Sequence, residues 1–206
     1  MIPLWKAAAG SFLALACSLF APSLGAQSTG ARQFVMSKQG QVTSLLHEPE
    51  SADRDRKVAQ VLDSMIDYDA LAKRSLAGHW DDLSAAQRKE FSGLLKQLVQ
   101  RSYQKNIQGI LDWNVEYLSE EPADPGVTVH TRATSKTNPR ADPVTIDYAL
   151  AERSGSYRVD DIVTEGSSLV GNYKNQFNRI LQKDGYDALI RRMRQKIAQG
   201  GEEHVK

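Results

Sequence analysis

The side chains best suited to acid–base or metal chemistry in this sequence are its histidines, and they are scattered along the chain. They are His47, His79, His130 and His204. None stands at a metal-ligand spacing with another type of ligand, and the single cysteine, Cys17, lies in an apolar run near the N-terminus. The one compact cluster is His79-Trp80-Asp81-Asp82, in which we interpret Trp80 as a packing residue and both aspartates as solvated charges. The histidines therefore predict no metal site.

Two further motifs could be read as catalytic. Asp160-Asp161 is a pair of carboxylates, but its segment has strand periodicity, and adjacent strand residues point to opposite faces, so we expect no shared site. Gly166-Ser-Ser168 lacks the Gly-x-Ser-x-Gly pattern of hydrolase nucleophiles and is better suited to cap the helix that follows. We therefore expect a protein that is not an enzyme, with no catalytic residue, no metal and no cofactor.

Residues 1–26 have the pattern of a secretory signal peptide. Lys6 is their only charge, an apolar run follows it, and small residues stand before Gln27. The alternative is a lipoprotein acylated at Cys17, which the preceding residues fit poorly. The pattern therefore predicts export from the cytoplasm.

The chain expected after cleavage comprises a single domain over residues 27–199 and a solvated tail over residues 200–206. Removing Lys6 from the 26 basic residues leaves 25, which balance the 25 acidic ones. A balanced surface argues against nucleic acid as a partner. We expect a monomer without disulfide bonds, because Cys17 is removed with the signal peptide.

Apolar residues at helical spacing predict two helical blocks, over residues 27–111 and 168–198. In the first, Ser84 and Gln87 form a capping box that begins a long helix. Its apolar stripe is Phe91, Leu94, Leu95, Leu98, Val99, Tyr103, Ile107 and Ile110. In the second, the stripe is Leu169, Tyr173, Phe177, Ile180 and Leu181. Gly185 predicts a break after that stripe.

Between the helical blocks, from Trp113 to Ile162, the period changes to two. The alternating apolar positions include Val115 and Tyr117, then Val127 and Val129, then Val144, Ile146, Tyr148 and Leu150, then Tyr157 and Val159. Turn signals rich in Pro, Gly, Asn and Ser separate these runs. The fold class predicted is therefore α+β, a four-stranded antiparallel meander wrapped by N- and C-terminal helices.

Several short motifs together resemble the toluene-tolerance, or Mla-type, family of periplasmic phospholipid-binding proteins. They are Ile66-Asp-Tyr-Asp69, Leu76-Ala-Gly-His-Trp80, Ser84-Ala-Ala-Gln-Arg-Lys-Glu-Phe91, Tyr103, Val159-Asp-Asp161, Glu165-Gly-Ser-Ser-Leu-Val170 and Asn172-Tyr-Lys-Asn-Gln-Phe177. Their order and spacing are more specific than any one of them. Two positions depart from the family pattern, Tyr157 in place of tryptophan and Lys174 in place of arginine.

The resemblance implies a periplasmic carrier whose sheet and helices enclose an apolar cavity for the acyl chains of a phospholipid. It also implies two partners, an outer-membrane lipoprotein complex and an inner-membrane ABC transporter complex with an MCE-domain subunit. We expect the cavity to be lined by apolar and aromatic residues of the sheet and of the two long helices. They are Leu94, Leu98, Val115, Tyr117, Val129, Ile146, Tyr148, Val159, Tyr173 and Phe177.

Two alternatives to a phospholipid carrier remain open. One is a carrier of another amphiphile, such as a hopanoid. The other is an adaptor with a solid core that only contacts membrane complexes, because a stripe at helical spacing is usually core and periodicity does not distinguish a filled core from a cavity.

Overall fold

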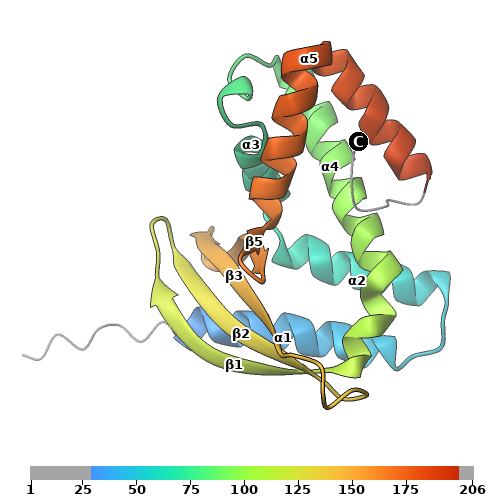
Figure 1. The fold of residues 1–206 in the computed structure, drawn as a ribbon, viewed down its shortest axis with the longest axis vertical. Helices are drawn as coiled ribbons and strands as arrows, with labels where there is room; N and C mark the ends of the chain where they lie inside the picture. Colours follow the sequence, from blue (N-terminus) through green and yellow to red (C-terminus); the bar gives the residue numbers. More distant parts are fainter. Residues whose placement is uncertain (1–28, 200–206) are drawn as a thin grey trace, which may run out of the picture.

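The computed structural model describes residues 29–199 of the chain. The expected signal peptide over residues 1–26 and the expected tail over residues 200–206 lie outside the described residues. Within that range lie five α-helices and five strands (Figure 1). The helices are α1 (Thr29–Leu46), α2 (Ala52–Met65), α3 (Tyr68–Leu76), α4 (Ala85–Asn106) and α5 (Leu169–Ala198). Short 3₁₀ turns, η1 (Ala77–His79) and η2 (Ile107–Asp112), follow α3 and α4.

Polar side chains begin the helices where the sequence places them. The side chain of Ser51 accepts from the backbone N–H of Arg54 at the start of α2, and Asp67 accepts from Ala70 at the start of α3. At α4, the Ser84 side chain accepts from the Gln87 backbone while the Gln87 side chain accepts from the Ser84 backbone. The capping box predicted from the sequence is therefore confirmed.

The sheet is antiparallel and runs in sequence order. Its strands are β1 (Trp113–Pro122), β2 (Val127–Ser135), β3 (Val144–Arg153), β4 (Ser156–Thr164) and β5 (Ser167–Ser168). The predicted count of four is wrong, because Ser167 and Ser168 return to pair with the end of β4. Glu165 and Gly166 both adopt positive φ, at 49° and 74°, which reverses the chain within two residues and allows this pairing.

The helices form two groups around the sheet. In Figure 1, α1 runs across one face of the strands, while α3, α4 and α5 form a bundle beyond the β4–β5 end. The contacts agree, since α1 meets β1, β2 and β4, whereas α5 packs on α3 and α4 and meets the sheet mainly at β4 and β5. The N-terminal helix therefore covers the centre of the sheet, and the C-terminal helix covers its end.

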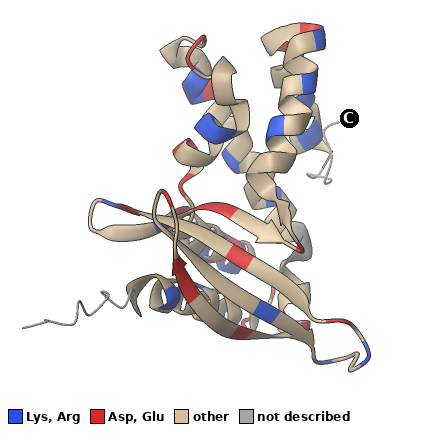
Figure 2. Cartoon of the chain, turned by 60° about the vertical axis from the view of Figure 1, so that its left-hand side comes forward, with Lys and Arg blue, Asp and Glu red and all other residues tan. Residues whose placement is uncertain are grey.

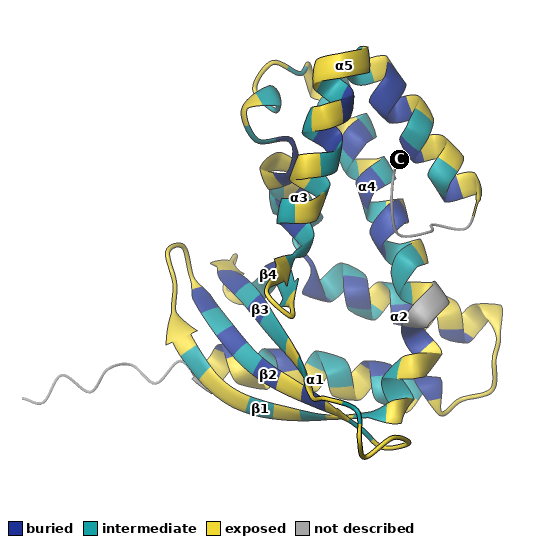
Figure 3. Ribbon diagram, in the orientation of Figure 1, coloured by how far each residue is buried: buried dark blue, intermediate teal, exposed yellow. Residues whose placement is uncertain are grey.

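The face of the sheet that α1 covers is its apolar face. Along β2, Val127, Val129, Thr131 and Ala133 are buried while the residues between them are more exposed, so the predicted alternation is confirmed (Figure 3). The opposite face carries acidic and basic residues (Figure 2), among them His130, whose Nδ1 lies 2.9 Å from a carboxylate oxygen of Asp147. From the apolar face that α1 covers, one large apolar cluster continues through α3 into the helix bundle.

Gly185 interrupts α5 with φ 76° and ψ 179°, where the sequence predicted a break. The second half of α5 turns back along α4, and the Tyr186 hydroxyl donates to the Gln87 carbonyl oxygen at 2.8 Å. The buried side chains of Leu189 and Met193 then complete the bundle core. Because of this break, both halves of α5 pack on α4.

The turn between β1 and β2 sets a steric limit that can be tested. Gly126 has φ +96°, and a Cβ built there would lie 2.0 Å from the Leu150 carbonyl oxygen; Gly155, at φ +77°, has nothing within 4 Å of its Cβ position. Gly155→Ala should cost about 1–2 kcal/mol for the left-handed backbone alone. Gly126→Ala should cost about 1–3 kcal/mol more, because backbone atoms must move. Urea unfolding followed by circular dichroism measures both, and equal losses would contradict the close approach.

Candidate functional site

The inner face of the sheet, defined here as the face that α1 covers, holds half of the residues predicted to line a cavity. They are Val115, Tyr117, Val129, Ile146 and Tyr148. The register places Tyr117 beside Thr131, Thr131 beside Ile146, and Val129 beside Tyr148. Val129 is fully buried and Tyr148 is 7% exposed, while Tyr117 and Ile146 are half-buried against the same cluster. These five side chains do share one surface.

Val159 occupies the end of this face, where the sheet meets the helix bundle. It is buried, pairs with Leu150 on β3, and forms a parallel bridge with Ile66 on its other side. The backbone N–H of Asp67 donates to the Val159 carbonyl oxygen at 2.8 Å. Val159 therefore joins β4 to the start of α3 and lies away from the centre of the sheet.

The predicted residues on the long helices belong to the bundle. Phe177 on α5 is fully buried, with its ring edge-on to Phe91 of α4 at 5.4 Å and stacked on Tyr173 at 5.2 Å. Leu98 is buried in the same cluster and Leu94 is half-buried against it. The structure thus divides the predicted set into a sheet group and a bundle group, joined by continuous apolar packing.

The sequence analysis predicted helical structure here but placed no residue of α1 among the cavity-lining residues, and so missed Gln39. The buried residues of α1 are Ala31, Val35, Val42 and Leu46, and Gln39 occupies the gap in that stripe at helical spacing. Its carboxamide Nε2 donates to the Tyr148 hydroxyl at 2.6 Å, and its Oε1 accepts from the Tyr117 hydroxyl. A polar residue within an apolar stripe was the available signal.

Three tyrosines surround this bridge, and burial keeps them neutral. Burial raises the pKa of Tyr148 to about 12, partly offset by the hydrogen bond from Gln39. Burial, and then the negative charge that Tyr148 would carry, raise the pKa of Tyr103 on α4 and of Tyr117 above the ordinary value. At neutral pH all three side chains are therefore hydroxyl groups that donate and accept hydrogen bonds.

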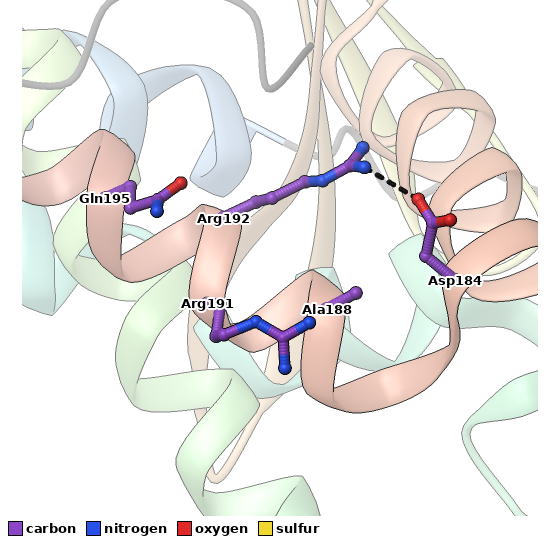
Figure 4. Close-up of a pocket in the computed structure, with 5 residues that line it drawn as sticks. All are labelled: Asp184, Ala188, Arg191, Arg192 and Gln195. Carbon is purple, nitrogen blue, oxygen red and sulfur yellow. Dashed lines mark hydrogen bonds and ion pairs between the residues drawn. The ribbon is translucent and has the colours of Figure 1, made fainter.

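Two hollows in the described part of the chain lie elsewhere. One, about 700 Å³, is a groove between α1 and α2 lined by residues such as Leu45 and Val61. The other, about 470 Å³, lies inside the bend of α5, where Arg192 pairs with Asp184 at 2.6 Å (Figure 4). The side chains of the inner face pack against α1 in this structure. The enclosed apolar cavity therefore remains a prediction.

The Asp160-Asp161 pair is brought together, and the expectation that the two side chains would not share a site is wrong. The pairing of β3 with β4 shifts between Ala149 and Leu150, which leaves Asp160 as the extra residue of a β-bulge. Both carboxylates are buried and both face Arg74 of α3, whose guanidinium lies 2.7 Å from Asp160 and 3.7 Å from Asp161. Alternation fails here because a bulge inserts one residue into the pleat.

Each carboxylate of the pair has a structural role. Asp161 accepts from the Ser168 hydroxyl at 2.6 Å and from the Val170 backbone N–H at 3.0 Å, which anchors β5 and the first turn of α5. Ser168 in turn accepts from the Gly171 N–H at 2.9 Å, so the predicted N-cap is confirmed. Burial raises the pKa of Asp160, and Arg74 opposes that shift. We refer to Arg74, Asp160, Asp161 and Ser168 as the clasp.

The remaining candidate cluster is also structural. Trp80 packs against the core, and the Arg88 guanidinium lies 5.6 Å from its ring centroid while donating to its carbonyl oxygen at 3.1 Å. The interpretation of Trp80 as a packing residue is therefore confirmed. Among residues 29–199, no three His, Cys, Asp or Glu side chains are grouped so that they could hold a metal ion.

The protein is an α+β fold in which a helix covers one face of a small antiparallel sheet and a helix bundle continues from the end of the sheet. This fold is similar to that of a known structure. The phospholipid-binding protein from Ralstonia solanacearum, solved in complex with a phospholipid, matches with a TM-score of 0.72 at 22% identity. The match covers 82% of this chain and 98% of that one. The likeness establishes the fold that the two proteins share.

Sequence comparison identifies the family. The intermembrane phospholipid transport system binding protein MlaC of Haemophilus influenzae is 21% identical over 136 residues, which are 65% of this chain. The chain spans 64% of the length of that relative. The family model described as MlaC protein matches residues 37–195, and the chain belongs to this family. The Mla-type resemblance predicted from the motifs is therefore confirmed.

The clasp predicts a pH-dependent loss of stability when Arg74 is removed. The folded pKa of Asp160 is raised, so its stabilising contribution is complete below the unfolded pKa and is lost as pH rises through the folded value. Arg74→Met removes the charge that lowers this pKa, so the variant should lose more stability at pH 7 than at pH 4. The loss at pH 7 should be about 1–3 kcal/mol, below the value for a fully buried pair because Arg74 is half-exposed.

Arg56→Met is the matched control for this comparison, because Arg56 and its partner Asp53 are both exposed. Its loss should stay within about 1 kcal/mol at either pH. Urea unfolding at the two pH values measures both variants. An Arg74→Met loss that does not grow between pH 4 and pH 7 would contradict the role assigned to the clasp.

Proposed function

We propose that this protein is a periplasmic carrier that binds a phospholipid and moves it between the outer membrane and an inner-membrane ABC transporter complex. Membership of the MlaC protein family is the observation that carries the proposal. Two relatives support it, one named for intermembrane phospholipid transport and one solved in complex with a phospholipid. The carrier acts by binding and release, without catalytic residues or a metal.

The energetics of lipid transfer define what such a carrier must supply. Each buried methylene contributes about 0.8 kcal/mol, so a two-chain lipid loses on the order of 20 kcal/mol of apolar transfer free energy when it leaves a bilayer. A carrier exchanges lipid with a membrane only when its own apolar interior offers a comparable contact area. The inner face of the sheet, facing α1, is the apolar surface best placed to provide it.

The proposed route needs a protein that leaves both membranes. In the described residues, no helix is long and apolar enough to cross a membrane. The partners we propose are an outer-membrane lipoprotein complex and an inner-membrane complex with an MCE-domain subunit. The near balance of 26 basic and 25 acidic residues favours docking and release over firm electrostatic adhesion.

Native mass spectrometry of the protein purified from the periplasm tests this function directly. A bound two-chain phospholipid is the expected result. A bound polycyclic triterpenoid would instead identify another amphiphile as the cargo. An empty protein that also acquires no lipid from vesicles would reject the carrier function in favour of an adaptor with a solid core.

Substitution of Ile146 tests where the lipid lies. Ile146 is half-buried on the inner face, and Ile146→Trp should occupy space that acyl chains need, which lowers the amount of co-purified lipid while the protein stays folded. Thr134→Trp is the control, because Thr134 is exposed on the opposite face of the sheet. This variant should bind as much lipid as the wild type does. A solid core at Ile146 would instead cost about 1–3 kcal/mol of stability. Unchanged lipid with that loss would reject the cavity at this face.

A further inference from the structure

The interior between α1, α4 and the sheet contains a polar cluster whose members come from four different elements. Gln39 of α1 bridges Tyr117 of β1 and Tyr148 of β3, and Tyr103 of α4 lies close enough to Tyr148 to raise its own pKa through that side chain. We call these four residues the tyrosine cluster. Tyr103 packs against both apolar clusters of the protein, so the tyrosine cluster lies where they meet.

The position of Gln39 is costly for a residue that only fills a core. Ala31, Val35, Val42 and Leu46 are buried on the same stripe of α1, and Gln39 interrupts them at its centre. Gln39 itself is half-buried; an amide without hydrogen bonds destabilises a protein by roughly 1–3 kcal/mol when its burial is complete and by less here, whereas an apolar side chain would have no such requirement. The two tyrosine hydroxyls satisfy Gln39, but a leucine facing two phenylalanines would fill the same space.

The tyrosine cluster has more donors than the protein uses. The Tyr148 hydroxyl accepts from Gln39, and no acceptor for its own proton lies within hydrogen-bond distance in the part of the chain that the structure describes. The buried Tyr148 hydroxyl therefore keeps the capacity to donate a hydrogen bond to a ligand.

Neutral donors in a region of low polarity suit neutral acceptors. Burial raises the pKa values of Tyr103, Tyr117 and Tyr148, the charge that Tyr148 would carry raises those of Tyr103 and Tyr117 further, and no lysine, arginine or histidine among the described residues contributes. A phosphate placed here would be a buried charge without a cation, which is strongly unfavourable. The carbonyl oxygen of an ester has no such requirement and accepts readily from a phenol.

We propose that the tyrosine cluster binds the ester carbonyl oxygens of a diacyl glycerolipid and thereby makes a diester lipid the preferred cargo over its diether analogue. This inference rests on the proposed carrier function and adds the chemical class of the lipid. Tyr148 is buried, whereas Gln39, Tyr103 and Tyr117 are half-buried, so the cluster lies between core and surface, where a glycerol backbone would lie if the acyl chains pointed inward. The head group then faces solvent.

The same atoms explain how the polar groups of Gln39 stay paired when no lipid is bound. Without lipid, the Gln39 Oε1 accepts from Tyr117 and its Nε2 donates to Tyr148, so the carboxamide takes the place of an ester. With lipid, ester carbonyl oxygens accept from the tyrosines, and Gln39 donates to either. The Gln39 carboxamide therefore has partners in both states and opposes neither loading nor release, while the Tyr148 hydroxyl proton gains an acceptor only with lipid.

The test uses the full mature chain and vesicles of matched phosphatidylcholines, one with ester-linked and one with ether-linked chains of the same length. The wild type should load the diester about fivefold to tenfold better, the factor that one net hydrogen bond supplies. Tyr148→Phe should bring that preference close to one by lowering diester loading and leaving diether loading unchanged. Tyr186→Phe is the control, since Tyr186 bonds to the Gln87 carbonyl oxygen in the helix bundle and its loss should leave the preference intact.

Two further arms separate the possible results. Diacylglycerol, which has the esters but no phosphate, should also load less well in Tyr148→Phe; a loss seen only for lipids that carry phosphate would overturn the ester assignment. Infrared spectroscopy of ¹³C-carbonyl lipid should show a lower carbonyl frequency in the wild type than in Tyr148→Phe. Equal frequencies, or equal loading of diester and diether by the wild type, would overturn the inference. A wild type that loads no lipid at all rejects the carrier function itself.

Discussion

Two adjacent carboxylates buried on one strand are tolerated only where both have hydrogen-bonding or charged partners, and three elements of the fold meet to provide them. Asp160 and Asp161 both face Arg74 of α3, and Asp161 also holds Ser168 and the first turn of α5. The sheet, the helix that precedes the bundle and the helix that ends it therefore meet at one β-bulge. Buried charges need such partners because the loss of hydration is otherwise uncompensated.

The clasp lies between two parts of the protein that differ in their packing. On one side, the bundle of α3, α4 and α5 is filled by aromatic packing around Phe177. On the other, α1 covers the sheet through a stripe that contains Gln39, and its first turn is anchored where the Arg32 backbone N–H donates to the Glu120 carboxylate. The bundle is an apolar core, whereas the sheet and α1 combine apolar surface with hydrogen bonds between side chains.

That mixture suits a carrier for an amphiphile. Acyl chains require apolar contact in proportion to their length, and the glycerol backbone requires hydrogen-bond partners at a defined depth. A purely apolar interior would bind the chains without orienting the molecule. The tyrosine cluster beside the inner face of the sheet supplies both kinds of contact within one layer of the fold.

The sequence by itself determined the elements and the family. The capping box at Ser84, the period of two along β2 and the break at Gly185 are local patterns, set by hydrogen bonds and side-chain direction within a few residues, and the structure has each of them. The order of the short motifs identified the family for the same reason, since each motif is contiguous. The inner-face candidates, such as Val129 and Tyr148, also followed from alternation.

Tertiary structure alone decided what opposes each apolar stripe. Periodicity shows which face of a helix is apolar but carries no information on its partner, so α5 was expected over the sheet that α1 covers. The bulge at Asp160 depends on the register between β3 and β4, and β5 on a chain reversal at Glu165 and Gly166 that only pairing stabilises. The hydrogen bonding of Gln39 was likewise decided by tertiary structure, because its two partners lie 78 and 109 residues further along the chain.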